Sequence, residues 1–124
     1  MQSVVRKASY SSVRIAWLDR EQLVNNVRSL ARALADARPE VKKVILFGSA
    51  AKGTSTPASD VDLVLVVEST SDRFIDRPLV YLPYFSDVGL GVDLAVYTAD
   101  EVRTGDISLL RVAESTGQVV FERS

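Results

Sequence analysis

The sequence predicts an α/β domain in which strands alternate with helices. Apolar residues recur at helical spacing between Leu23 and Leu34, and short apolar runs typical of strands cover 41–47 and 92–97. The run over 61–67 is apolar on both faces, which indicates a central strand covered by helices on each side. With 124 residues, of which 47% are hydrophobic, the chain has the size of one domain and can build a core.

The first part of the chain is expected to lead into one long helix. Residues 1–10 show no clear period, whereas the alternation over 13–18 predicts a short strand. Asp19 is the expected N-cap of an amphipathic helix over 20–37, with Gln22 three residues later as in a capping box.

The middle of the chain carries the predicted strands of the sheet. The strand over 41–47 is followed by residues 48–59, whose Gly, Ser, Thr and Pro content predicts a loop. The central strand over 61–67 comes next, and two prolines restrict the segment 74–85 to a short helix or irregular structure. A third strand is predicted over 92–97.

The C-terminal part is predicted to add two helices and a last strand. Thr98 and Glu101 have the spacing of a capping box at the start of the first helix. Asp106 is expected to cap the second helix, which ends at Gly117. Residues 118–122 are expected to form an edge strand.

The composition excludes several kinds of chemistry. The chain has 15 basic and 16 acidic residues and no strongly basic patch, so nucleic acid is not expected as a direct partner. It has no histidine and no cysteine, which excludes serine–histidine triads, imidazole-based zinc sites, thiolate sites and disulfides. No apolar run approaches the roughly 20 residues of a membrane span, and no signal peptide is recognisable, so we expect a cytoplasmic protein.

Two carboxylates stand at the start of the predicted central strand. Residues i and i+2 of a strand point to the same face, so Asp60 and Asp62 would project together. Like charges this close repel unless a cation lies between them, and Mg²⁺ prefers oxygen ligands. An Asp-x-Asp pair is common in solvated loops, but Asp62 lies within an apolar strand, where an unpaired charge is costly. We therefore predict that Asp60 and Asp62 bind a metal ion.

Asp93 is the third candidate, because it lies inside the apolar strand over 92–97. It would complete a carboxylate triad if this strand neighbours the central one. We predict that Asp93 is a second metal ligand or the base that takes the proton of an acceptor. The alternative is an ordinary carboxylate at the end of a strand.

Gly48 and Ser49 directly follow the strand over 41–47 and predict a phosphate-binding turn. Glycine permits close approach of a ligand to the backbone, and Ser49 can cap a helix or donate its hydroxyl to a phosphate. Lys52 could add positive charge, and Ser59 could bind the nucleotide or only cap the turn before Asp60. An ordinary turn and a surface lysine are the alternatives. Together with the carboxylates, these residues predict a site for a metal-bound nucleoside triphosphate.

Two segments, Phe47 to Gly53 (FGSAAKG) and Ser59 to Leu63 (SDVDL), resemble the signature of the polymerase-β-like nucleotidyltransferase superfamily. The short length resembles its minimal members, the antitoxin-type partners of HEPN-domain proteins. Lys52 stands where many relatives have arginine, which keeps the charge but loses bidentate geometry. The resemblance covers residues 19–124 and leaves residues 1–18 as an N-terminal extension.

The resemblance implies a polymerase-β-like fold, with a mixed β-sheet flanked by helices. It implies that Asp60, Asp62 and Asp93 hold Mg²⁺, as two ions, and that Gly48 and Ser49 hold the triphosphate of ATP. The implied reaction transfers a nucleotidyl group, usually AMP, to an acceptor with loss of pyrophosphate. In the minimal branch the acceptor is typically a tyrosine of a HEPN-domain toxin, so this chain would be the antitoxin of a type VII-like toxin–antitoxin pair.

Two other functions stay open at this point. The chain could neutralise its partner by binding alone, although a pure binding protein has no reason to keep three like charges together. It could also be a nucleotidyltransferase for a small molecule such as an antibiotic, which needs an acceptor pocket that a homo- or hetero-oligomer would have to complete. The sequence does not determine the preferred base, the number of AMP units transferred or the identity of the partner.

Overall fold

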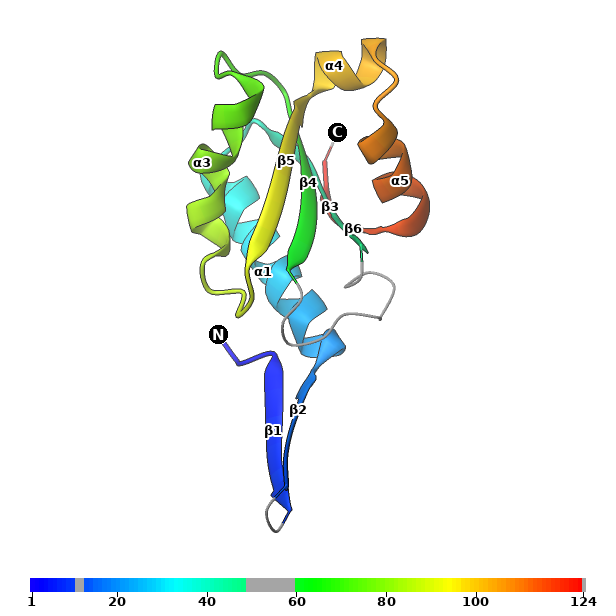
Figure 1. Ribbon diagram of the computed structural model, residues 1–124. Helices are drawn as coiled ribbons and strands as arrows, with labels where there is room; N and C mark the ends of the chain where they lie inside the picture. Colours follow the sequence, from blue (N-terminus) through cyan, green and yellow to red (C-terminus); the bar gives the residue numbers. More distant parts are fainter. Residues whose placement is uncertain (11–12, 49–59, 124) are drawn as a thin grey trace.

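The computed structural model describes residues 1–10, 13–48 and 60–123. This part of the chain forms a mixed β-sheet with helices on both faces, together with an N-terminal β-hairpin, which confirms the predicted fold class (Figure 1). The elements, in chain order, are β1 (Val5–Tyr10), β2 (Val13–Leu18), α1 (Arg20–Ala37), β3 (Val41–Phe47), β4 (Val61–Val67), the 3₁₀ helix η1 (Phe74–Asp76), α3 (Arg77–Tyr81), the 3₁₀ helix η2 (Leu82–Phe85), β5 (Val92–Thr98), α4 (Ala99–Thr104), α5 (Ser108–Thr116) and β6 (Gln118–Glu122).

The main sheet has the strand order β5-β4-β3-β6. β3 runs antiparallel to both of its neighbours, whereas β4 and β5 are parallel. The predictions of a central strand over 61–67 and of an edge strand over 118–122 are therefore confirmed. β5 is the other edge of the sheet, and the chain reaches it from β4 through η1, α3 and η2.

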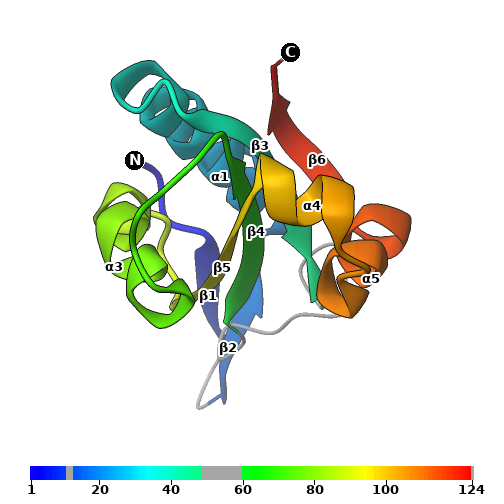
Figure 2. The ribbon, with the colours of Figure 1, turned by 90° about the horizontal axis from the view of Figure 1, so that it is seen from above.

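One face of the sheet packs against α1 and the segment from η1 to η2, which together form one layer (Figure 2). Alternate residues of β4, from Val61 to Val67, are fully buried on this face. They meet the predicted apolar stripe of α1, which includes Leu23 and Leu34, and Phe85 of η2. Each such side chain stabilises the fold by roughly 1.5–3 kcal/mol. Within the described residues, no helix has both the length and the apolar character needed to cross a membrane.

The opposite face of the sheet is covered by a smaller apolar cluster beneath α5. Leu110 and Ala113 of α5 pack on Ile45 of β3 and on Val64 and Val66 of β4. These β4 positions alternate with those that face α1, so the next position on this side towards the start of β4 is residue 62. The sheet face at the starts of β4 and β5 therefore lies beyond the cluster, and a cavity opens there.

Helix α1 begins at the predicted residue but without the predicted capping box. The Asp19 carboxylate accepts a hydrogen bond from the Gln22 backbone N–H at 3.0 Å. The side-chain amide of Gln22 does not bond to the backbone of the N-cap residue. It donates instead to Asn26 Oδ1 at 2.8 Å. Asp19 therefore acts as a cap on its own.

The two C-terminal helices begin differently. Thr98 and Glu101 form a complete capping box at the start of α4, as predicted. The prediction that Asp106 caps α5 is wrong, since Ile107 occupies the N-cap position and no side chain bonds there. Asp106 instead lies 3.0 Å from Arg111 in an exposed ion pair, because the helix begins one residue later than expected.

The segment between β4 and β5 is fastened to the sheet by the buried side chain of Arg77. Its Nη1 donates to the carbonyl of Val96 at 3.1 Å, and its Nε donates to the carbonyl of Asp72 at 3.2 Å. Nη1 and Nη2 also donate to the two carboxylate oxygens of Glu101, at 2.7 and 3.2 Å. Arg77 therefore ties the crossover to both β5 and α4.

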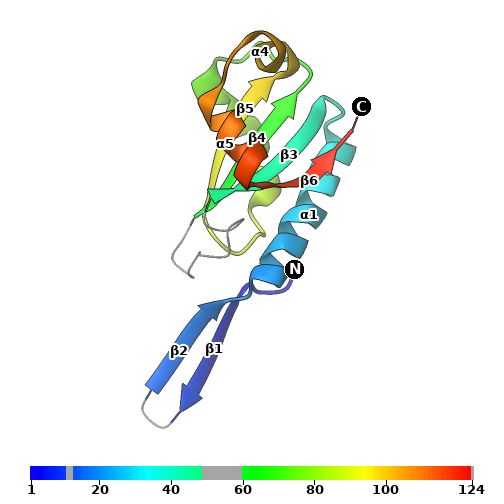
Figure 3. The same cartoon turned by 90° about the vertical axis from the view of Figure 1, so that its right-hand side faces the viewer.

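The N-terminal hairpin of β1 and β2 projects from the domain at the end where β4 and β5 begin (Figures 1 and 3). β2 confirms the predicted short strand, whereas β1 was not predicted because residues 1–10 show no clear period. The base of the hairpin is attached to the domain. Val4 is fully buried in the core, and its carbonyl accepts a hydrogen bond from the Asp19 N–H at 2.7 Å.

Candidate active site

The strand register places two of the predicted carboxylates side by side. Phe47, the last residue of β3, pairs with Asp62 of β4, and Asp62 pairs with Asp93 of β5. Neighbouring strands lie about 4.8 Å apart, so the three residues form one row across the sheet. The condition set for Asp93, that its strand neighbours the central strand, is therefore met.

Both carboxylates line a cavity of about 360 Å³ on the face of the sheet that carries α5. Its floor is the start of β4 and β5, and one wall comes from the first turn of α5. This volume lies within the usual range for small-molecule sites. The lining residues are Phe47, Asp62, Leu63, Asp93, Leu94, Ala95 and Leu109.

Gly48 lies directly against the carboxylate of Asp62. Its φ of 72° is in the left-handed region, which side chains other than glycine rarely adopt. A Cβ at this position would stand 2.3 Å from Asp62 Oδ2. Gly48 therefore satisfies two demands at once, a turn after β3 and space for a carboxylate.

Asp60 precedes β4 and is exposed. It lies beside the turn that leads into β5, where Gly91 accepts a hydrogen bond from the Val61 N–H at 2.8 Å. The same turn contacts the base of the hairpin, since a Cβ on Gly89 would stand 3.0 Å from Val4 Cγ2. The N-terminal segment and Asp60 are thus supported by one turn.

The three carboxylates act on each other electrostatically. Burial raises the pKa of the Asp62 carboxyl above its ordinary value, and the charges of Asp93 and Asp60 raise it further. Charged Asp62 is therefore disfavoured in the folded protein until a cation compensates the repulsion. This arrangement costs stability and has no structural benefit in the described contacts, which is typical of a functional site.

The donor set fits Mg²⁺ with a nucleotide better than it fits an all-protein metal site. Within the described part of the chain, no group of three or more Asp, Glu, His or Cys side chains converges closely enough to hold a metal ion. Magnesium is commonly held by one or two carboxylates, with phosphate oxygens and water completing its octahedral shell. Asp62 and Asp93, as adjacent oxygen donors that line a cavity, meet that requirement.

The structure brings together only part of the predicted site. Gly48, Asp60, Asp62 and Asp93 lie at the same end of the sheet, whereas Ser49, Lys52 and Ser59 lie outside the described residues. Two residues of the site were not predicted, Gly91 and Leu109. Gly91 is visible in the sequence only as part of a turn, and Leu109 only as an apolar residue of a helix, so neither gave a signal of its own.

Comparison with known proteins shows the family of this chain. The model of the nucleotidyltransferase domain family (NTP_transf_2) matches residues 27–115, which is most of the chain. The chain therefore belongs to the nucleotidyltransferase domain family. The matched region contains the larger part of α1, the sheet strands β3 to β5 and the four predicted site residues that the structure describes, Gly48, Asp60, Asp62 and Asp93.

Individual relatives agree with the family match. The chain is 26% identical over 110 residues to "Putative protein adenylyltransferase MJ1305" of Methanocaldococcus jannaschii, covering 83% of this chain and 75% of the relative. A "putative nucleotidyltransferase" from Sulfolobus solfataricus has a similar structure, with a TM-score of 0.62, 20% identity and 84% of both chains covered. A toxin–antitoxin structure with AMP-PNP has a TM-score of 0.59 and 25% identity, covering 82% of this chain and 74% of that chain.

A further structure, the toxin–antitoxin MntA-HepT, has a TM-score of 0.53 and 21% identity, with 83% of this chain and 73% of that chain covered. At this identity the likeness shows the fold alone. Family and fold together make this chain a nucleotidyltransferase, an enzyme that acts on a nucleotide substrate.

Proposed function

We propose that this protein transfers AMP from ATP, with Mg²⁺, to a tyrosine hydroxyl of a HEPN-domain toxin, and that it is the antitoxin of the pair. The observation that carries the proposal is the row of Phe47, Asp62 and Asp93 across three adjacent strands. In this row Gly48, where the proposed phosphate-binding turn begins, lies next to Asp62, and Asp62 lies next to Asp93. This is the arrangement that a metal-bound triphosphate needs.

Each residue of the site has a distinct role in this proposal. Asp60 and Asp62 hold Mg²⁺, and Gly48 and Ser49 bind the triphosphate, with Lys52 and Ser59 as further contacts. Bound Mg²⁺ supplies neutralisation of the phosphate charge and lowers the pKa of the acceptor hydroxyl. Asp93 is a further metal ligand or accepts the proton of the attacking hydroxyl.

The bond changes of the proposed reaction balance without a further reactant. The acceptor oxygen forms a bond to the α-phosphorus while the bond from that phosphorus to the bridging oxygen of pyrophosphate breaks. The hydroxyl proton leaves to Asp93 or to water. No histidine is needed for this step, and the sequence contains none.

Two relatives support the choice of a protein acceptor. The name of the Methanocaldococcus jannaschii protein describes it as an adenylyltransferase acting on protein. The structure with a TM-score of 0.59 and 25% identity is a toxin–antitoxin structure with AMP-PNP. These names favour ATP as the donor and a toxin as the partner over a small-molecule acceptor.

The test is to incubate this protein with a HEPN-domain partner, ATP and Mg²⁺, and to measure the intact mass of the partner. We expect a gain of one or more AMP units that maps to a tyrosine and disappears when EDTA is added. Asp60→Ala combined with Asp62→Ala is the matched control, because it removes the metal ligands and leaves the described core unchanged.

The outcomes separate the proposed function from its alternatives. A gain in mass with the wild type alone supports protein adenylylation. A stable complex with no gain in mass would contradict it and indicate neutralisation by binding. Transfer to a small molecule but not to the partner would indicate the small-molecule function.

A further inference from the structure

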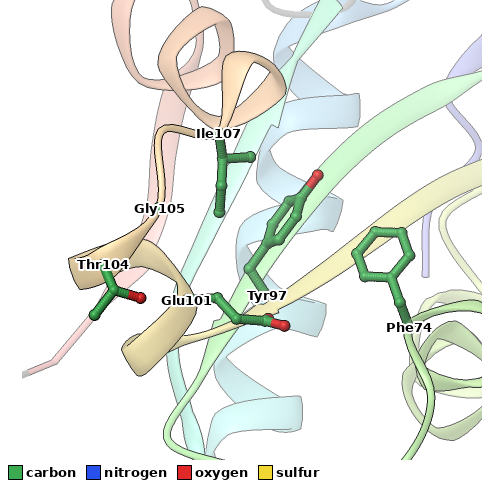
Figure 4. A pocket seen from close by; sticks show the side chains of 6 residues that line it. All are labelled: Phe74, Tyr97, Glu101, Thr104, Gly105 and Ile107. Atoms are coloured by element: carbon green, nitrogen blue, oxygen red, sulfur yellow. The ribbon is translucent and has the colours of Figure 1, made fainter.

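A second cavity lies on the same face of the sheet as the carboxylates, near the C-terminal end of β5. It has a volume of about 310 Å³ and a mainly apolar lining. Tyr97 lies between Ile107 and Phe74 in this cavity, with Glu101 and Thr104 of α4 beside it (Figure 4). We call it the aromatic pocket; its lining residues are Phe74, Tyr97, Glu101, Thr104, Gly105 and Ile107.

The aromatic pocket is aligned with the candidate active site along β5. Asp93, Ala95 and Tyr97 are alternate residues of this strand and therefore face the same side of the sheet. Asp93 and Ala95 line the first cavity, and Tyr97 lines the second. The four residue steps from Asp93 to Tyr97 span about 13 Å, a distance that two or three side chains of a bound polypeptide can cover.

The order of the strands indicates which substrate approaches over β5. Gly48 follows β3, Asp62 belongs to β4 and Asp93 to β5, so the proposed phosphate turn and Asp93 lie on opposite sides of Asp62. An in-line transfer needs the attacking oxygen opposite the leaving pyrophosphate. If the triphosphate lies at the β3 side, the acceptor comes from the β5 side. β5 is an edge strand, so a second protein can reach it.

Two polar side chains of the aromatic pocket, those of Glu101 and Thr104, already form hydrogen bonds within the protein. Both oxygens of Glu101 accept hydrogen bonds from Arg77, which also neutralises its charge. The Thr104 hydroxyl donates to the carbonyl of Asp100 at 2.8 Å. A nucleobase is recognised by several hydrogen bonds to its edge, and the pocket offers mainly the Tyr97 hydroxyl for them. The pocket suits an apolar or aromatic side chain instead.

The apolar surface continues from the pocket onto the crossover segment. Phe74, whose ring centroid lies 5.3 Å from that of Tyr97, is 49% exposed, and Ile75 beside it is 76% exposed. Leu79, one helical turn further, is 70% exposed. An exposed apolar rim of this kind is typical of protein–protein contacts.

We propose that the aromatic pocket and its rim at Phe74 and Ile75 bind an apolar or aromatic side chain of the protein acceptor, and so position the acceptor hydroxyl at Asp93. This inference rests on the proposed transfer to a protein. It assigns the acceptor to the β5 side of the site and leaves the nucleotide to the β3 side. The pocket then determines which protein is modified and takes no part in the chemistry.

The test measures AMP transfer at increasing concentrations of the HEPN-domain partner, and separately at increasing concentrations of ATP. Phe74→Ala and Ile75→Ser are the test variants, and Phe74→Leu is the conservative variant that retains an apolar contact. Val112→Ser is the matched control, since Val112 is an exposed apolar residue of α5 that lines neither cavity. Ile75 is so exposed that its substitution leaves the core unchanged.

We expect Phe74→Ala and Ile75→Ser to raise the KM for the partner by about fivefold or more, with the KM for ATP and the kcat within about twofold of the wild type. Phe74→Leu should raise the KM for the partner much less than Phe74→Ala does, and Val112→Ser should have the KM of the wild type. An unchanged partner KM in both test variants would overturn the inference while leaving the proposed function intact. A raised ATP KM in its place would show that the pocket binds the nucleotide. Absence of transfer by the wild type itself would refute the proposed function, and this inference with it.

Discussion

Gly91 makes room for the carboxylate of Asp60. A Cβ on Gly91 would stand 2.6 Å from Asp60 Oδ1, closer than real Cβ contacts allow. The two residues belong to different segments, one directly before β4 and the other directly before β5. They are joined by the hydrogen bond from the Val61 N–H to the Gly91 carbonyl, which fixes the distance between the two strand starts.

Replacing Gly91 by alanine should therefore displace Asp60 without unfolding the protein. The φ of Gly91 lies outside the left-handed region, so alanine can adopt the backbone conformation, and the hydrogen bond to Val61 uses only main-chain atoms. We expect Gly91→Ala to lower transfer by about tenfold or more at limiting Mg²⁺, since displacements of about 1 Å are costly at reacting groups. Titration of Mn²⁺ in the presence of AMP-PNP should show weakened metal binding.

A double-mutant cycle distinguishes this positioning role from a general loss of structure. In an Asp60→Ala background the added methyl group has no carboxylate to displace, so Gly91→Ala should change Mn²⁺ binding by less than about twofold. Equal losses in both backgrounds would show that Gly91 acts through the fold and not through Asp60.

Asp62 should destabilise the protein that lacks a ligand. Its pKa is raised by burial and by the charges of Asp93 and Asp60, and a raised carboxyl pKa means that the charged form costs stability at neutral pH. We expect Asp62→Asn to abolish transfer while raising the Tm by roughly 2–5 °C. Thermal unfolding with and without Mg²⁺ and ATP measures both effects, because ligand stabilises only a protein that binds it.

Asp36→Asn provides a comparison for Asp62→Asn. Asp36 is an exposed carboxylate of α1 that pairs with Arg32 at 3.8 Å, so its removal should shift the Tm by no more than about 1 °C. A fall in Tm for Asp62→Asn would mean that the carboxylate supports the fold, which contradicts a purely functional role.

The positions of the carboxylates were predictable to the extent that local geometry determines them. Asp60 and Asp62 share a face because side chains alternate along a strand, and this period can be read from the sequence. The adjacency of Asp62 and Asp93 could only be stated as a condition. It depends on how the segment from η1 to η2 returns the chain to the sheet, and that return is fixed by long-range contacts such as Arg77 with Val96.

Strand β1 and the Gly91 contact show the opposite case, in which local pattern carries no information. β1 lacks an apolar period, and its pairing with β2 is set by the antiparallel register from Val5 with Leu18 onward. Asp106 was a reasonable cap by residue type, but the apolar face of α5 fixes where that helix begins, and Asp106 falls outside it. Tertiary packing decides such positions, and one-residue differences at helix ends follow from it.

Arg77 should contribute much more to stability than Arg73, its neighbour in the same segment. Arg77 is buried and bonded to two carbonyls and to Glu101, whereas Arg73 is an exposed residue paired with Asp76 at 2.9 Å. Removing one partner of a buried charged network leaves the others unsatisfied. We expect Arg77→Ala to lower the free energy of unfolding by about 2–3 kcal/mol and Arg73→Ala by less than about 0.5 kcal/mol.

Urea unfolding of the two variants measures this difference. The expected loss in free energy of unfolding for Arg77→Ala is smaller than for a fully buried ion pair. The reason is that the Glu101 side chain is 42% exposed and its charge is partly screened by solvent. Equal losses in the two variants would show that the crossover segment does not depend on Arg77.

The Arg77–Glu101 pair also predicts how stability changes with pH. Hydrogen bonds from Arg77, and then from the Thr98 N–H, hold the pKa of Glu101 below its ordinary value of 4.5. A carboxylate whose pKa is lower in the folded state contributes stability above the unfolded pKa and loses that contribution as the pH falls through the folded value. We therefore expect the wild type to be more stable than Glu101→Gln at neutral pH, with the difference shrinking below about pH 4.5.

Urea unfolding of both proteins between neutral pH and acid pH tests this expectation. Glu114→Gln is the control, because Glu114 is an exposed residue that lies 3.6 Å from Lys43, and such surface pairs contribute about 0–1 kcal/mol. A difference between wild type and Glu101→Gln that stays constant down to acid pH would show that the ionised carboxylate is not what stabilises α4. In that case the neutral amide introduced by Glu101→Gln would have to bond to Arg77 and to the Thr98 N–H as well as the carboxylate does. The capping box alone would then account for the start of α4.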